Sequence, residues 1–118
     1  MEMFDRQTSK VKSFYRRLAA RYDELASASN YKKVYDEITW RLTEPFLPSN
    51  GLVLDAGGGT GRWAVPMAER GLKVIVYDIS KEMLRIAARK VEDMGLGHLI
   101  STIQGDIRRI KYPDNTFD

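Results

Sequence analysis

The sequence contains no cysteine, only one histidine and only four prolines among its 118 residues. Without cysteine there is no disulfide framework, no thiolate metal site and no cysteine nucleophile, so nothing requires an oxidising compartment. No apolar run approaches the roughly 20 residues that cross a bilayer, and residues 1–6 lack the apolar core of a signal peptide. We therefore expect a cytoplasmic protein with no membrane partner and no bound metal.

A strong excess of one charge is also lacking, because 19 lysines and arginines stand against 16 acidic residues, which gives a net charge of +3. The two signs are interleaved along the chain, which is typical of a solvated surface and not of a nucleic-acid footprint. Nucleic acid is therefore not an expected partner. The length and a hydrophobic content of 43% suit one domain with a modest core.

The chain is organised around residues 53–61, with the sequence Val-Leu-Asp-Ala-Gly-Gly-Gly-Thr-Gly. A short apolar run that ends in glycines predicts a buried strand and a tight turn, and the spacing of apolar residues over 62–69 predicts a helix after it. Glycines let a ligand lie against bare backbone. Asp55 at the strand end repels phosphate but suits an ammonium or a ribose hydroxyl. The alternative interpretation is a turn that only permits close packing of strand and helix.

Two more apolar runs, over residues 73–78 and 99–104, predict two further strands. Asp78 ends the first of them, about 20 residues after the glycine turn, and Asp106 follows the second. Ser80 is the predicted N-cap of a helix that runs to Gly95. Three strands separated by two helices predict the βαβαβ half of a doubly wound, Rossmann-like α/β sheet, with the three acids at its carboxyl edge.

Two amphipathic patterns precede this unit, over residues 8–28 and 34–46, and Pro45 and Pro48 end the second. We expect a helical arm over residues 1–50 that packs on the unit of residues 51–118 or covers its mouth as a lid. The lysines and arginines on the outer faces of these helices are predicted to be solubilising.

Several stretches, in this order, resemble the motifs of class I S-adenosylmethionine-dependent methyltransferases. Residues 54–61 resemble the acid-x-Gly-x-Gly-x-Gly motif, residues 76–84 are similar to the second strand with its ribose acid, and residues 105–107 are similar to the adenine-side motif. Residues 112–118 look like the lead-in to the fourth strand. Residues 21–23, Arg-Tyr-Asp, are similar to the N-terminal segment of the branch that includes the ubiquinone and menaquinone biosynthesis C-methyltransferases. The resemblance implies a three-layer sandwich.

The resemblance also implies roles at the methionine end of a bound cofactor. The turn at Gly57, Gly58 and Gly59 would pass under the methionine part, and Asp55 would lie close to its ammonium, directly or through water. Tyr22 would reach from the arm to close the site.

At the nucleoside end, the resemblance implies that Asp78 holds the ribose hydroxyls and that Ile79 lies on the adenine face. Asp106 would accept a hydrogen bond from the exocyclic amine, and Ile107 would flank the ring. The implied activity is methyl transfer from S-adenosylmethionine to a small-molecule acceptor, with S-adenosylhomocysteine as product. No catalytic residue is implied.

Two other functions stay open at this point. A domain for NAD(P) or a flavin dinucleotide is one, because Ala56-x-Gly58-x-x-Gly61 approximates Gly-x-Gly-x-x-Gly and Asp78 would suit its ribose. Against it stand an alanine at the first glycine position, an acid facing pyrophosphate and no role for Asp106. A cofactor-binding module without catalysis is the other. His98 is predicted to be a surface turn residue, far from the ligand edge.

The chain is shorter than the family resemblance implies, because the sheet of that family has seven strands and residues 117–118 stand where the fourth would begin. We therefore expect residues 52–54 at an open sheet edge, which is a pairing hazard. The hypothesis is that the chain is truncated before the fourth strand and pairs with a missing C-terminal half, or that the edge is paired in a homodimer.

Overall fold

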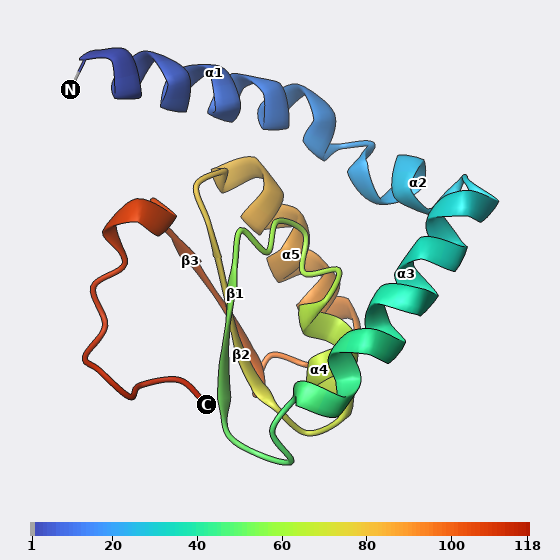
Figure 1. Cartoon of the computed structure of the whole chain (residues 1–118). Helices are drawn as coiled ribbons and strands as arrows, with labels where there is room; N and C mark the ends of the chain where they lie inside the picture. The colour runs from blue at the N-terminus through green and yellow to red at the C-terminus, as the bar shows by residue number, and fades with distance from the viewer. Residues whose placement is uncertain (1) are drawn as a thin grey trace.

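The structure is a computed structural model that describes residues 2–118, so Met1 of the predicted arm lies outside the described residues. Figure 1 shows α1–α3 curving along the top and one side of a unit built from three strands and the helices α4 and α5. The elements are, in chain order, α1 (Glu2–Ala19), α2 (Tyr22–Ser27), α3 (Asn30–Thr43), η1 (Glu44–Phe46), β1 (Leu52–Ala56), α4 (Ala64–Glu69), β2 (Lys73–Asp78), α5 (Lys81–Asp93), β3 (Ile100–Gln104) and η2 (Ile107–Arg109).

The three strands form one parallel sheet in the order β1-β2-β3. Asp55 of β1 is paired in register with Val76 of β2, and Val76 is paired with Thr102 of β3. The central strand, β2, is the most buried of the three, as its run of Val, Ile, Val and Tyr predicts. The predicted βαβαβ arrangement is therefore confirmed.

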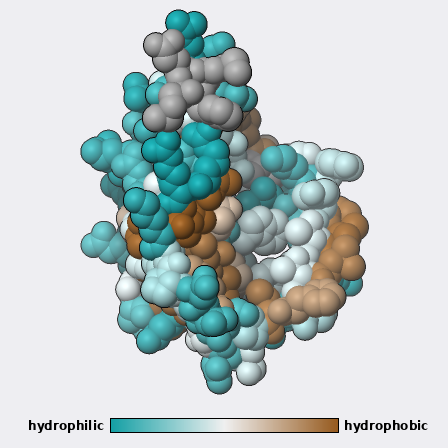
Figure 2. All heavy atoms as spheres, turned by 60° about the vertical axis from the view of Figure 1, so that its left-hand side comes forward, coloured by the Kyte–Doolittle hydropathy of each residue, from teal (hydrophilic) through white to brown (hydrophobic). Residues whose placement is uncertain are grey.

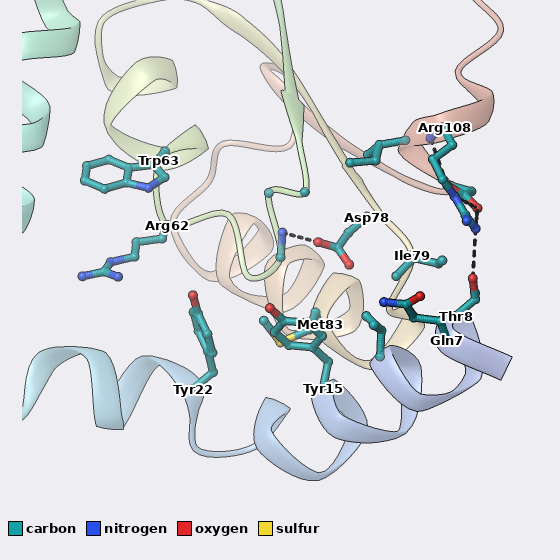
Figure 3. Close-up of a pocket in the computed structure, with 16 residues that line it drawn as sticks. Gln7, Thr8, Tyr15, Tyr22, Arg62, Trp63, Asp78, Ile79, Met83 and Arg108 are labelled. Atoms are coloured by element: carbon teal, nitrogen blue, oxygen red, sulfur yellow. Dashed lines mark hydrogen bonds and ion pairs between the residues drawn. The ribbon is translucent and has the colours of Figure 1, made fainter. Parts of the chain in front are cut away.

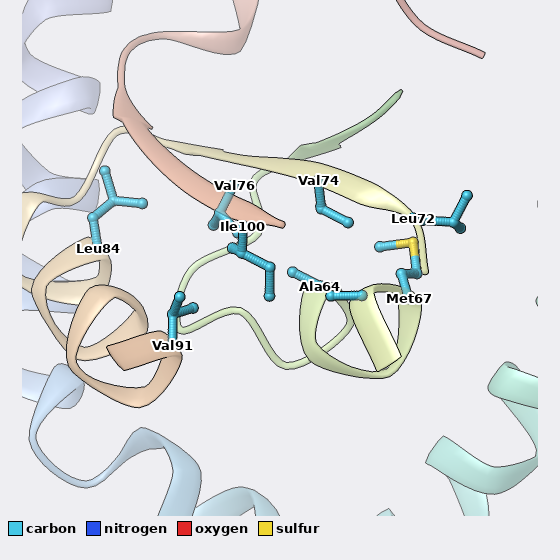
Figure 4. Close-up of a cluster of buried hydrophobic side chains, with 9 residues drawn as sticks. Ala64, Met67, Leu72, Val74, Val76, Leu84, Val91 and Ile100 are labelled. Carbon is cyan, nitrogen blue, oxygen red and sulfur yellow. The ribbon is translucent and has the colours of Figure 1, made fainter. Parts of the chain in front are cut away.

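The hydrophobic core lies between one face of the sheet and the helices α4 and α5 (Figure 4). Val74 and Val76 point to this face because alternate residues of a strand share a side. They meet Met67 of α4 and Leu84 of α5, and all four side chains are buried. This packing fixes the strand ends that carry the predicted site residues.

The prediction of one helix over residues 8–28 is wrong, because the chain turns at Ala20 and Arg21 and divides into α1 and α2. The Arg21 N–H donates to the Leu18 carbonyl at 3.0 Å. Neither glycine nor proline marks the turn. The turn at Ala20 and Arg21 directs α2 so that the Asp23 side chain reaches Thr60, 37 residues further along the chain. Apolar periodicity does not encode such a tertiary contact.

The helix after the glycine turn is shorter than predicted, since α4 begins at Ala64 and not at residue 62. Pro66 is therefore its third residue, in the first turn, where backbone N–H groups have no intrahelical acceptor. The proline costs α4 no hydrogen bond. The predicted cap of α5 is confirmed, because the Ser80 hydroxyl accepts a hydrogen bond from the Met83 N–H at 3.2 Å.

The arm buries little of its apolar surface. Ala19 is its one buried hydrophobic residue among those whose side chains are described, whereas many large apolar side chains of the arm are exposed. These are Val11, Phe14, Leu25, Tyr31, Val34, Tyr35, Ile38, Leu42 and Phe46. Figure 2 shows hydrophobic patches interrupting the hydrophilic surface of one face of the molecule. Over residues 2–118, no helix has both the length and the apolar content to cross a membrane.

The outer edge of β1 lies beside the last residue of the chain (Figure 1). The Asp118 N–H donates to the Leu52 carbonyl at 2.9 Å, and the Asp118 carboxylate accepts from the Leu52 N–H at 2.9 Å. Among residues 2–118, β1 pairs with one other strand, β2, so β1 is an edge strand as predicted.

Candidate functional site

A cavity of about 590 Å³ lies between the arm and the carboxyl edge of the sheet (Figure 3). It is the place where an open α/β sheet binds its ligands. The residues that line it are Gln7, Thr8, Val11, Tyr15, Tyr22, Gly57, Gly58, Gly59, Arg62, Trp63, Asp78, Ile79, Met83, Asp106, Ile107 and Arg108.

The glycine turn forms the floor of the cavity, and its amides are already bound within the protein. The N–H groups of Gly57 and Gly58 both donate to the Tyr77 carbonyl, at 2.7 and 3.3 Å. The Gly59 N–H donates to Asp78 Oδ2 at 2.9 Å. Gly57 and Gly59 have φ angles of 75° and 56°, a region that favours glycine. A phosphate bound here would find none of these three amides free to donate.

Asp78 stands at the rim of the cavity between the turn and α5. Its Oδ1 accepts from the Ser80 N–H at 2.8 Å, while Oδ2 accepts from Gly59. Two backbone donors hold the carboxylate in one orientation, and each oxygen keeps the capacity for a further hydrogen bond. Asp78 is thus a pre-oriented acceptor for ligand hydroxyls.

Asp55 lies beneath the turn and is not among the residues that line the cavity. A Cβ atom placed on Gly58 would lie 2.6 Å from Asp55 Oδ2, so the carboxylate touches the underside of the turn. This buried oxygen has no hydrogen-bond partner among the described residues. Burial, and to a lesser degree the charge of Asp78, raise the pKa of Asp55 from 3.8 to about 6.

Asp106 follows β3 and is engaged by Arg108. Its Oδ1 accepts from the Arg108 backbone N–H at 2.9 Å, and both oxygens accept from the guanidinium. These hydrogen bonds lower the pKa of Asp106 to about 2, so the carboxylate is ionised. Arg108 also donates to the Thr8 hydroxyl of α1 at 2.9 Å, which ties this wall of the cavity to the arm.

The segment that carries Asp106 and Ile107 leaves the sheet against the ring of Tyr77. The Tyr77 hydroxyl donates to the Asp106 carbonyl at 3.4 Å. A Cβ atom on Gly105 would overlap the same phenol group. Glycine at position 105 therefore permits the close approach that sets where this wall stands.

The arm closes the cavity from the side opposite the sheet. Tyr15 of α1 and Tyr22 of α2 extend from the arm toward the glycine turn, and Arg62 and Trp63 lie on the side next to Tyr22 (Figure 3). The Arg62 guanidinium is 5.6 Å from the centre of the Trp63 ring and pairs with Asp36 of α3.

Eight of the nine residues predicted to bind a cofactor line this one cavity, and Asp55 lies just behind it. His98, in contrast, is exposed at the amino end of β3. Among residues 2–118 there is no cluster of three or more side chains suited to a metal ion.

The family model of a methyltransferase domain matches residues 53–118, which is more than half of the chain. The chain belongs to the class I methyltransferase family. Within it, the chain is 32% identical over 120 residues to the ubiquinone/menaquinone biosynthesis C-methyltransferase UbiE of Coxiella burnetii, a match that covers 97% of this chain and 47% of that protein. It is 29% identical to the demethylmenaquinone methyltransferase of Geobacillus kaustophilus, covering 98% and 50%. The chain spans about half the length of these relatives.

Solved structures show the same fold. The [4+2]-cyclase SpnF superimposes with a TM-score of 0.82 at 23% identity, covering 94% of this chain and 47% of that one. A methyltransferase from Geobacter sulfurreducens in complex with S-adenosyl-L-homocysteine has a TM-score of 0.52 at 25% identity, covering 60% and 29%. The cyclase shows that a class I methyltransferase fold by itself does not define the reaction.

Sequence reasoning missed part of the cavity wall of this methyltransferase domain. Thr8 and Tyr15 lie on the predicted first helix and Gln7 directly precedes it, but the apolar pattern gave no sign that these residues face a ligand site. Trp63 lies on the helix predicted over residues 62–69, whose apolar pattern did not mark it as a cavity residue. Arg108, two residues after Asp106, carried the available signal, because an arginine so placed can pair with the acid.

Proposed function

We propose that this chain binds S-adenosylmethionine in the cavity and forms the cofactor-binding portion of a methyltransferase for a small-molecule acceptor. One observation carries the proposal: an acid lies at or near the carboxyl end of each of the three strands, while the turn amides are engaged inside the protein. Such a site disfavours the pyrophosphate of NAD(P) or a flavin dinucleotide and favours a nucleoside that carries cationic groups and no phosphate.

The assignment of groups follows the positions of the side chains. We assign the ribose hydroxyls to Asp78, whose oxygens keep accepting capacity, and the adenine ring to the apolar walls of Ile79 and Ile107. Asp106 would accept from the exocyclic amine while it stays paired with Arg108. These residues then fix one end of the ligand with hydrogen bonds on one side and apolar contacts on the other.

At the other end, we assign the methionine part to the turn of Gly57, Gly58 and Gly59, with Tyr22 closing over it. The unpartnered Oδ2 of Asp55 supplies negative charge directly beneath the turn, where the ligand ammonium would lie. A direct contact is blocked by the turn, so we propose that Asp55 acts through the electrostatic field or through a water molecule.

When bound, S-adenosylmethionine supplies a methyl group already activated on a sulfonium, and its transfer leaves S-adenosylhomocysteine. The work of the residues is therefore alignment of the methyl group with the acceptor, together with exclusion of water. Tyr15, Arg62 and Trp63 line the cavity outside the proposed nucleoside subsite, and we assign them to the acceptor side.

The names of the relatives support a small-molecule acceptor, since UbiE and the demethylmenaquinone enzyme are named for quinone biosynthesis. The acceptor of this chain, its pairing with a further half or with a second copy, and its cytoplasmic location stay predictions. The division into an arm over residues 1–50 and a cofactor unit over 51–118 is likewise our proposal.

Isothermal titration of the chain with S-adenosylhomocysteine and with NADH tests the proposal. Binding of the first and not of the second is expected. Asp78→Ala should weaken the binding of S-adenosylhomocysteine by about 1–3 kcal/mol, because it removes the acceptor for two ligand hydroxyls. Asp93→Ala, an exposed acid at the end of α5, is the matched control and should bind as the unaltered chain does. Tight binding of NADH with none of S-adenosylhomocysteine would overturn the proposal.

A further inference from the structure

Asp23 of α2 contacts two elements of the cofactor unit at once. Its Oδ1 accepts a hydrogen bond from the Thr60 hydroxyl at 2.7 Å, and its Oδ2 pairs with Lys90 Nζ of α5 at 2.7 Å. Thr60 is 1% exposed and stands inside the glycine motif, between Gly59 and Gly61. One carboxylate of the arm thus joins the glycine turn to the helix that packs beneath it.

Tyr22 precedes Asp23 and lines the cavity. Successive residues of a helix project about 100° apart, so the two side chains of α2 serve different neighbours while the backbone holds them in a fixed relation. The helix has six residues and no side-chain hydrogen bond at its N-cap. A helix this short is not stable by itself in water, so its position depends on such tertiary contacts.

We propose that Asp23 is a positioning residue that holds Tyr22 over the glycine turn. By binding Thr60 and Lys90 together it fixes α2, and Tyr22 with it, against the glycine turn and α5. This inference rests on the proposed function, because it takes the ligand over the turn to be S-adenosylmethionine or its product.

A second ion pair between the arm and α5 provides a control for the role of Asp23. Arg16 of α1 pairs with Glu82 of α5 at 3.3 Å, and the side chain of Arg16 is largely exposed. This pair also ties the arm to α5, but it reaches neither the glycine motif nor a neighbour of Tyr22. Loss of a general arm tether can therefore be separated from loss of the contact made by Asp23.

A double-mutant cycle tests the inference, with the affinity for S-adenosylhomocysteine as readout. Asp23→Ala and Tyr22→Ala should each weaken binding ~10-fold, and the double variant should be little weaker than the single ones, because Asp23 acts through Tyr22. Glu82→Gln should leave affinity unchanged. A double variant whose loss equals the product of the single losses would overturn the inference, as would Asp23→Ala with unaltered affinity.

Variants of Thr60 keep the test decisive if Asp23→Ala does not fold. Thr60→Ser retains the hydroxyl donor and should bind as the unaltered chain does, whereas Thr60→Val removes the donor at nearly constant volume and should weaken binding several-fold. Equal affinity of the two variants would contradict the role of Asp23. Absence of binding by the unaltered chain would instead overturn the proposed function, and this inference with it.

Discussion

The arm and the cofactor unit hold their positions by different forces. In the unit, side chains such as Leu72, Val74 and Val76 are almost completely buried between the sheet and its helices. In the arm, large apolar side chains such as Phe46 and Tyr31 are 88% and 79% exposed. Two partly buried arm residues, Trp40 and Leu47, pack against the core, and most of the remaining links between arm and unit are polar, among them those of Asp23 and Asp36.

Because of this difference, the part of the cavity wall that the sheet forms is fixed, whereas the part that the arm forms is adjustable. The stabilisation from buried apolar area is not screened by salt, whereas partly exposed ion pairs are weak and are screened by ions. The acids at the sheet edge therefore keep their geometry, while Tyr22 and Tyr15 depend on contacts that form and break at small cost. Three expected outcomes, from the largest effect to the smallest, would sharpen or break this comparison.

The largest expected effect is that of Leu72→Ala in the unit against Leu42→Ala in the arm. Leu72 is 1% exposed, so its truncation leaves a cavity and should lower the free energy of unfolding by about 2–5 kcal/mol. Leu42 is 68% exposed, and its truncation should change that free energy by less than about 0.5 kcal/mol. Urea unfolding followed by circular dichroism measures both. Similar losses for the two variants would show that the arm shares the core.

Asp55→Asn should stabilise the ligand-free chain at pH 7 by about 1–2 kcal/mol, because it removes a charge that burial disfavours. The folded protein binds a proton at Asp55 more readily than the unfolded chain does, since the pKa rises from 3.8 to about 6. The contribution of this group to stability is therefore present at low pH and is lost as the pH rises from about 4 to about 6.

Thermal unfolding from pH 4 to pH 7 measures this difference. The unaltered chain and the Asn variant should have similar stability near pH 4 and should diverge as the pH rises. At pH 7 the variant should also bind S-adenosylhomocysteine more weakly, since the negative charge beneath the turn is gone. If the Asn variant had a lower free energy of unfolding than the unaltered chain at pH 7, this would contradict the buried and unpartnered placement of the Asp55 carboxylate.

The smallest effect concerns salt and the arm. Raising the salt concentration from 0.05 to about 0.5 M should speed tryptic cleavage in the arm, at sites such as Lys32 and Lys33, by ~3-fold, because it screens the ion pairs that hold α2 and α3. Cleavage within the unit should not change. Mass spectrometry of the fragments separates the two regions, and equal acceleration in both would mean that the arm is not held by charge.

Much of the unit could be predicted from the sequence because its signals are local. Short apolar runs that end in Asp55 and Asp78 predicted the strands, and Ser80 predicted the start of α5; the structure confirms both features. The helix predicted over residues 62–69 began two residues too early, because the glycine turn extends to Trp63 before α4 begins.

The arm could be predicted only in part, because its geometry is set by contacts between residues far apart in the sequence. The break between α1 and α2 comes with the bond from Thr60 to Asp23, across 37 residues. The contact of Thr8 with Arg108 spans 100 residues. No spacing of apolar residues encodes either pairing, so the wall that the arm contributes to the cavity emerges only from the fold.

The close contact of Gly105 with Tyr77 has a consequence for ligand size. A methyl group added at position 105 would push aside either the phenol or the strand end that carries Asp106 and Ile107. Neither Gly105 nor Tyr77 lines the cavity, yet their contact sets where the wall that carries Asp106 and Ile107 stands. To fit a bulkier or a slimmer nucleoside analogue, one should therefore alter Gly105 and Tyr77, which lie behind the cavity wall, before altering the residues that line the cavity.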